Sequence, residues 1–187
     1  MKKTLFVHSV LVLVLISLGC GGSVLTRGQL NTIRAKDPEK YTIVAGYIAT
    51  PPFANLNEVH IETSEDEVAA HAEGDFFTAV VPLGPVRLNE VIFTTRQGMG
   101  GATIVTMRTI KKSEVDFVSG DSKGGFLWLG AFRTYPGPIY QGDLKTGSRV
   151  GEPLAVLKDD ISAKKRAQII TTLKSQLRGT AWEKVLK

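Results

Sequence analysis

The sequence has little cysteine and little histidine. Its 187 residues include one Cys and three His, which excludes a disulfide within the chain and disfavours a zinc site built from Cys and His. It contains no G-x-x-x-x-G-K-[ST] phosphate loop, no H-E-x-x-H pair and no Asp-x-Asp-x-Asp-Gly calcium loop. The commonest signatures of nucleotide, zinc and calcium sites are therefore missing, and we predict no cofactor and no bound metal.

The first twenty residues have the composition of an export signal. Lys2 and Lys3 precede an apolar run from Leu5 to Leu18 that only His8, Ser9 and Ser17 interrupt. This run is short for a span of the ~30 Å hydrocarbon core, but it has the length of a signal-peptide apolar region. An uncleaved anchor or an ordinary signal peptide cut elsewhere is the alternative.

The signal region ends at the only cysteine of the chain. Ser17-Leu18-Gly19-Cys20 resembles the lipobox of bacterial lipoproteins, although the Leu usually found three positions before the Cys stands here at position 18. The resemblance implies cleavage between Gly19 and Cys20, a lipid on Cys20, and a membrane as the partner of that lipid. Gly21 in place of an inner-membrane retention Asp favours the bacterial outer membrane.

Removal of residues 1–19 lowers the formal net charge. The segment contains two lysines and no acid, so the charge falls from +5 to +3. A nucleic-acid partner requires a concentrated basic face, which this balance does not indicate. After Cys20, the polar and Gly-containing stretch to Lys40 predicts a flexible tether between the lipid and the domain.

Short β-like runs separated by Gly and Pro fill residues 41–158. We expect strands at 41–49, 57–63, 75–81, 86–94, 102–110, 126–135 and 139–144. The run 126–135 is almost continuously apolar, which favours a central strand. Within 86–94 the apolar phase slips between Leu88 and Val91, which predicts a β-bulge. The class expected is an antiparallel β-sandwich, prealbumin-like or immunoglobulin-like, with a C-terminal amphipathic helix.

One segment has a counterpart in known modules. Gly74-Asp75-Phe76-Phe77 followed by Pro82-Leu83-Gly84-Pro85-Val86 resembles the prealbumin-like sandwich modules of bacterial envelope proteins. Val86 stands where those modules favour an aromatic residue. The resemblance implies a fold class and no activity.

The C-terminal segment 159–187 has helical periodicity. Asp159 or Asp160 is expected to cap a helix whose apolar stripe is Ala163, Ala167, Ile170, Leu173 and Leu177, and a short second helix follows Thr180. The basic residues of the first helix suit a membrane surface or a partner, but the simpler interpretation is that its stripe packs on the β domain.

Three groups of residues are candidates for functional sites. Glu58, His60, Glu62 and the acidic residues after them predict a solvated acidic rim rather than a metal site. The Gly-rich segments 96–102 and 119–125 are interpreted as adaptable hairpin loops rather than phosphate loops. Five aromatic residues, Phe126, Trp128, Phe132, Tyr135 and Tyr140, are better explained as core than as a ligand pocket.

These observations predict a lipid-anchored protein of the cell envelope that is not an enzyme and has no catalytic residue. Its activity would be the binding of an envelope protein or wall component, with the Gly-rich loops as the contact surface. The alternative is a small envelope hydrolase that uses acidic residues, which requires a cleft with two convergent carboxylates.

Overall fold

The computed structural model describes residues 25–99, 102–134, 141–145, 147 and 153–186, and at 96–99, 102–105 and 141 only the backbone. Its strands are β1 Tyr41–Ala49, β2 Ala54–Glu62, β3 Glu67–Glu73, β4 Phe76–Pro82, β5 Gly84–Met99, β6 Ala102–Lys111, β7 Ser119–Ser122, β8 Gly125–Thr134 and β9 Leu154–Val156. Its helices are α2 Arg27–Arg34, α3 Lys112–Val115, α4 Asp159–Gln176 and α5 Ala181–Val185. The signal region, Cys20 and the first residues of the expected tether lie outside the described residues.

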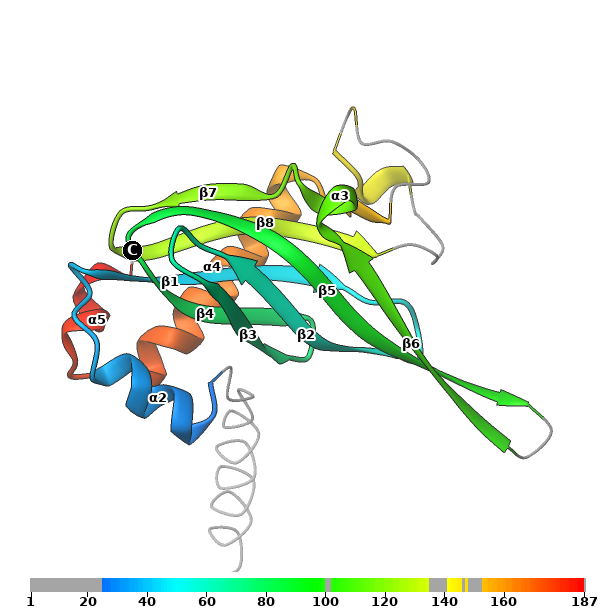
Figure 1. Cartoon of the computed structure of the whole chain (residues 1–187), viewed down its shortest axis with the longest axis horizontal. Helices are drawn as coiled ribbons and strands as arrows, with labels where there is room; N and C mark the ends of the chain where they lie inside the picture. Colours follow the sequence, from blue (N-terminus) through cyan, green and yellow to red (C-terminus); the bar gives the residue numbers. More distant parts are fainter. Residues whose placement is uncertain (1–24, 100–101, 135–140, 146, 148–152, 187) are drawn as a thin grey trace, which may run out of the picture.

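The strands form one sheet that curls around a hydrophobic interior (Figure 1). Their order is β6-β5-β2-β3-β4-β1-β8-β9, and β7 pairs with β5. Side chains of β1, β2, β4, β5 and β8 share one buried cluster, although several of these strands are not neighbours in the sheet. Ser122 of β7 lies 2.6 Å from the Thr42 hydroxyl of β1, and this hydrogen bond connects the two sides of the curl.

The expected antiparallel sandwich is corrected in two respects. The strands belong to a single sheet, and β1 pairs with β8 in parallel, from Thr42 opposite Gly125 to Ala49 opposite Arg133. A parallel pair needs a long crossover between its strands, and here that connection contains most of the other strands. Alternation of apolar residues reports which face is buried but not the direction of the partner strand. The mainly β class with a C-terminal helix is confirmed.

Strand β1 is buried on both faces. Val44 and Ile48 point into the curled interior, whereas Ile43 and Ala45 pack against the helices. The run predicted as central, now β8, has only the three-residue β9 on its outer side. The doubly covered position at the centre of the fold is therefore occupied by β1.

The predicted bulge in the fourth run is confirmed. In the pairing of β5 with β2, Glu90 lies opposite His60 and Leu88 lies opposite Ile61, so Asn89 is the extra residue. The slip lets Leu88 and Val91 both face the interior, where each is fully buried.

Helices α2, α4 and α5 cover the outer face of the sheet near β1 and β8 (Figure 1). Ile169, Ile170, Leu173 and Leu177 pack with Ile43 and Ala45, so α4 does pack on the β domain. The buried face of α4 is rotated relative to the predicted apolar stripe, because Ala163 and Ala167 are exposed and Ile169 is buried. Asp159 and Asp160 lie in the first turn of α4, and Lys158 is the N-cap residue.

The segment expected to be a tether is folded from Leu25 onward. Thr26 and Gln29 form a capping box that starts α2, and Leu25 and Ile33 are each 2% exposed. The indole Nε1 of Trp182 donates to the carbonyl oxygens of Ile33 and Lys36, which ties α2 to α5. All the described contacts lie within residues 25–186, and a chain that begins at residue 20 contains every residue that makes them.

Two further differences concern short elements. Strand β3 was not predicted, because its residues Glu67–Glu73 were read as part of an acidic rim. The strand expected at 139–144 is a 3₁₀ turn at Gln141–Asp143 followed by Leu144, which bridges to Leu157. Residues 139 and 140 lie outside the described residues.

Candidate functional site

The outer face of β2, β3 and β5 brings one histidine between two carboxylates. His60 Nδ1 lies 2.6 Å from Glu67 Oε1, and His60 Nε2 lies 3.1 Å from Glu58 Oε2. The amide of Asn89, the bulged residue of β5, donates to the other oxygen of Glu67. Pairing of β2 with β3 and β5 places these side chains together, because residues opposite each other in a sheet share a face.

The two carboxylates raise the pKa of His60 above its ordinary value of 6.5, mainly through the hydrogen bond to Glu67 and then that to Glu58. The same hydrogen bond lowers the pKa of Glu67. Within the described residues, no group of three or more His, Cys, Asp and Glu side chains has the geometry to hold a metal ion. What the structure shows here is one histidine hydrogen-bonded to two carboxylates on the outer face of the sheet.

Replacement of Glu67 by Gln should lower the pKa of His60, because the neutral amide no longer favours the imidazolium. An NMR titration of the imidazole should show a pKa above 6.5 in the parent chain and a lower value in the variant. Since the folded pKa is raised, the stabilisation is fully present below the unfolded pKa and is lost as pH rises through the folded pKa.

Glu65→Gln is the matched control, because Glu65 is an exposed carboxylate on the neighbouring β2–β3 turn and only its backbone N–H makes a hydrogen bond in this structure. Its His60 titration should match that of the parent chain. An equal shift in both variants would show that general surface charge, and not the hydrogen bond, sets the pKa.

The remaining acidic residues of this region do not converge. Glu62 pairs with Lys112, and His71 Nε2 lies 3.7 Å from Glu73. Asp75 lies in the turn between β3 and β4, where it accepts hydrogen bonds from Tyr47 and Thr50. Burial, together with the charge of Asp75, raises the pKa of Tyr47 to about 12, so this phenol stays protonated at neutral pH.

A cavity of about 380 Å³ is a candidate for the cleft that the hydrolase alternative requires. Its lining contains a single carboxylate, Glu62, and that carboxylate forms an ion pair with Lys112. An acid–base pair of carboxylates requires a second one across the scissile bond. This cavity therefore does not supply the arrangement that the hydrolase alternative requires.

The Gly-rich segment 119–125 is packed rather than adaptable. Ser119–Ser122 form β7, the N–H of Gly124 donates to Thr42, and a Cβ at Gly124 would lie 2.9 Å from Pro38 O. The spacing of Gly120, Ser122 and Gly124 also matches the G-x-S-x-G pattern of hydrolase nucleophiles, which the hairpin interpretation passed over.

The surroundings of Ser122 do not fit a nucleophile. Its side chain is 2% exposed, and its Oγ lies 2.6 Å from Thr42 Oγ1 and 2.9 Å from Pro82 O. A nucleophile elbow leads from a strand into a helix, whereas the segment after Ser122 continues into β8. The hydroxyl serves to connect β7 with β1.

The aromatic residues of β8 have structural contacts. Phe132 is buried in the curled interior, and Phe126 and Trp128 pack under α4, where Trp128 Nε1 donates to Ser162. The core interpretation is confirmed for these three. Tyr135 and Tyr140 lie outside the described residues.

The β1–β2 turn holds a feature that the sequence interpretation missed. Ala54 N–H donates to Pro51 O, and the third residue of this turn, Phe53, has φ +66°. This is the arrangement of a type II turn, in which glycine is the usual third residue because a Cβ is strained there. Phe53 is nevertheless 81% exposed. The conformation costs about 1–2 kcal/mol, and the exposed ring gains no burial in return.

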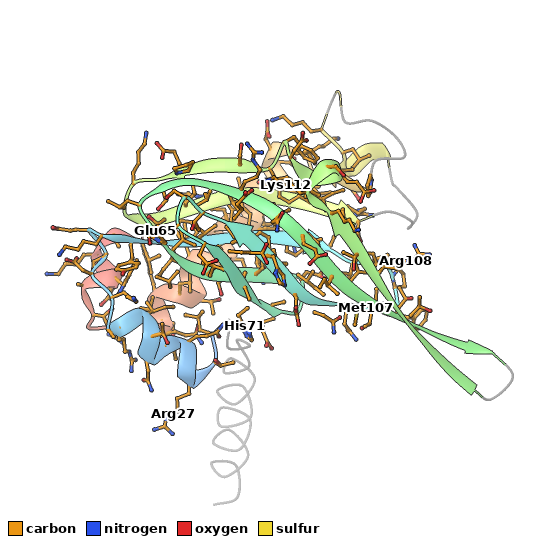
Figure 2. The ribbon with its side chains drawn as sticks, in the orientation of Figure 1. Arg27, Glu65, His71, Met107, Arg108 and Lys112 are labelled. Atoms are coloured by element: carbon orange, nitrogen blue, oxygen red, sulfur yellow. The ribbon has the colours of Figure 1, made fainter. Side chains whose placement is uncertain are left out.

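A second exposed apolar side chain lies at the same end of the sheet. Ala54 pairs with Thr95 of β5, and the adjacent Thr94 pairs with Met107 of β6. Met107 is 67% exposed and stands at the base of the arm that β5 and β6 extend beyond the other strands (Figure 2). We call Phe53 and Met107 the exposed apolar pair. The only sequence feature that indicates the exposed apolar pair is the proline-rich turn before Phe53.

Comparison of the chain with protein-family models, curated proteins and solved structures found no match. Among the described residues, no helix is both long enough and apolar enough to cross a membrane.

Proposed function

We propose that the protein is a lipid-anchored binding module of the bacterial cell envelope, held at the outer membrane through Cys20. The support for the anchor is the lipobox-like Ser17-Leu18-Gly19-Cys20 after a short apolar run. Two or three acyl chains give stable membrane attachment, whereas a single chain gives only marginal attachment.

The buried position of Leu25 sets how far the domain stands from such an anchor. Leu25 is five positions after Cys20, and an extended chain of that length spans at most about 18 Å. The helical end of the domain would therefore lie close to the lipid surface. The β5–β6 arm extends from the opposite end (Figure 1), so it would be presented away from the anchor.

The partner would be an envelope protein that contacts the exposed apolar pair. Phe53 carries this proposal, because an 81% exposed phenylalanine in a left-handed backbone conformation weakens the fold and glycine would serve the turn better. Strained and exposed residues of this kind are typical of functional surfaces, and aromatic anchors dominate binding energy at protein interfaces.

Replacement of Phe53 by Gly should weaken partner binding while leaving the fold intact or slightly more stable. The loss of an aromatic anchor costs about 2 kcal/mol or more of binding free energy. A photo-crosslinking residue at position 107, in the native envelope, measures this as a fall in the yield of the captured partner. Urea denaturation measures stability in parallel.

Leu83→Ser is the control, because Leu83 is also an exposed apolar residue, 44% exposed, but precedes β5 at the end far from the arm. It should leave the crosslinking yield unchanged. If Phe53→Gly lowers stability, or if both variants give the parent yield, the proposed contact surface is wrong.

A further inference from the structure

Four exposed cations lie on α2 and around the C-terminal end of α4, two helices that meet near Leu25. Arg27 and Arg34 belong to α2, and Lys174 and Arg178 lie at the C-terminal end of α4. Gln176 joins the two helices, since its Nε2 donates to Leu25 O and its own carbonyl oxygen accepts from Arg34. We call these four residues the basic patch. Figure 2 shows Arg27 pointing from α2 away from the domain.

Acidic residues border the stretches that carry the basic patch: Asp37 follows α2, Asp160 lies in the first turn of α4, and Glu183 accepts from the N–H of Gly179, next to Arg178. Residues 25–36 and 161–182 contain eight Lys and Arg residues and no Asp or Glu. In the part of the chain that the structure describes, none of the four patch residues forms an ion pair. Six acidic residues lie on β2, β3 and their turn.

Helix stability explains only part of this patch. Arg34 and Lys174 lie in the last turns of their helices, where a cation interacts favourably with the helix dipole. Arg27 is the first residue of α2, where a cation is unfavourable, and the first turn contains no acid. Arg178 lies beyond the end of α4. Stabilisation by the helix dipole therefore does not account for Arg27.

We propose that the basic patch binds the headgroups of anionic phospholipids. The proposal rests on the proposed lipid anchor, because Leu25 lies two residues before Arg27 and five residues after Cys20. An anchor there brings all four cations to the membrane surface, where each Lys or Arg contributes to attraction by anionic lipid. The lipid on Cys20 attaches the protein, and the patch sets which side of the domain faces the membrane.

The test uses the chain from residue 20 with Cys20→Ser, which contains every residue of the described fold and has no lipid. Its binding is measured by co-sedimentation with vesicles of phosphatidylethanolamine and phosphatidylglycerol, and with vesicles of phosphatidylcholine alone, at about 0.1 M salt. We expect at least about tenfold stronger binding to the anionic vesicles, and a decline as salt increases.

Two double variants with the same change in net charge locate the binding surface. Lys174→Glu with Arg178→Glu should weaken binding to anionic vesicles about tenfold or more. Arg108→Glu with Lys111→Glu changes two exposed cations of β6 and should have little effect. Urea midpoints establish that both variants fold.

Three results would overturn the proposal: equal binding to both kinds of vesicle, equal losses in the two double variants, or binding to the anionic polymer heparin as strong as that to vesicles. The anchor is tested separately by the mass of the N-terminal peptide. An unmodified Cys20 together with patch-dependent vesicle binding would refute the anchor alone. An acylated Cys20 together with vesicle binding that does not depend on the patch would refute the patch alone.

Discussion

Cells that produce the Cys20→Ala chain should show it released from the membrane fraction or accumulated as an uncleaved precursor. The reason is that lipidation requires the thiol of Cys20, and each buried methylene of an acyl chain contributes about 0.8 kcal/mol to membrane attachment. Loss of two or three chains removes more binding free energy than the basic patch can supply. Membrane fractionation and mass spectrometry of the N-terminal peptide measure the outcome.

Ser23→Ala is the control for this variant, because Ser23 lies just past the predicted cleavage point and has no role in the lipobox-like motif. It should remain acylated and membrane-bound. A cleaved parent chain whose first residue is an unmodified Cys20 would contradict the lipid anchor.

The Trp182→Ala variant should lose about 3–5 kcal/mol of unfolding free energy. Trp182 is 1% exposed, and its Nε1 donates to Ile33 O at 2.7 Å and to Lys36 O at 3.0 Å. The substitution leaves a large cavity between α2 and α5 and deprives two carbonyl oxygens of their donor. Because a domain of this kind is stable by about 5–15 kcal/mol, urea denaturation should show a much lower midpoint.

The Trp182→Phe variant separates the loss of buried volume from the loss of the indole hydrogen bonds. Phenylalanine keeps most of the apolar volume but cannot donate, so we expect a loss of about 1–3 kcal/mol. Lys184→Ala, a substitution of an exposed residue of α5, should stay within about 0.5 kcal/mol of the parent. A Trp182→Ala variant as stable as the Lys184→Ala variant would show that α2 and α5 are not held together by the indole.

Local sequence patterns predicted the elements whose two ends have strong turn signals. Strand β1 runs from Tyr41 to Ala49 as expected, because Pro51 and Pro52 follow it directly and its residues are β-branched and aromatic. The bulge at Asn89 was readable because a phase slip in alternation is a local signal.

Tertiary contacts decided the features that were not predicted. The α2 segment has three polar or small residues at its start, Arg27, Gly28 and Gln29, and it is ordered by Leu25 and Ile33 packing on residues about 140 positions later. In α4, the choice of Ile169 over Ala167 as a buried residue depends on how the helix is rotated on the sheet. Neither fact is encoded within a short window of sequence.

The candidate sites also divide into features that local sequence indicates and features that only tertiary contacts create. The side chains around His60 were already suspected as a group, but the partners Glu67 and Asn89 come from β3 and from the β5 bulge, so only strand register brings them together. Phe53 was missed because the left-handed position of a type II turn favours glycine, and its occupation by phenylalanine is visible only in the backbone angles.

The double coverage of β1 also bears on how the chain folds. This strand is made early, but its parallel partner begins at Gly125 and the helix that covers it begins at Asp159. Contacts between residues so far apart in sequence require large loops to close first, which slows folding. On the proposed export route, with the N-terminal end crossing first, β1 and its antiparallel partner β4 would emerge long before β8 and α4. Closure of the domain around β1 would then wait until almost the whole chain had crossed.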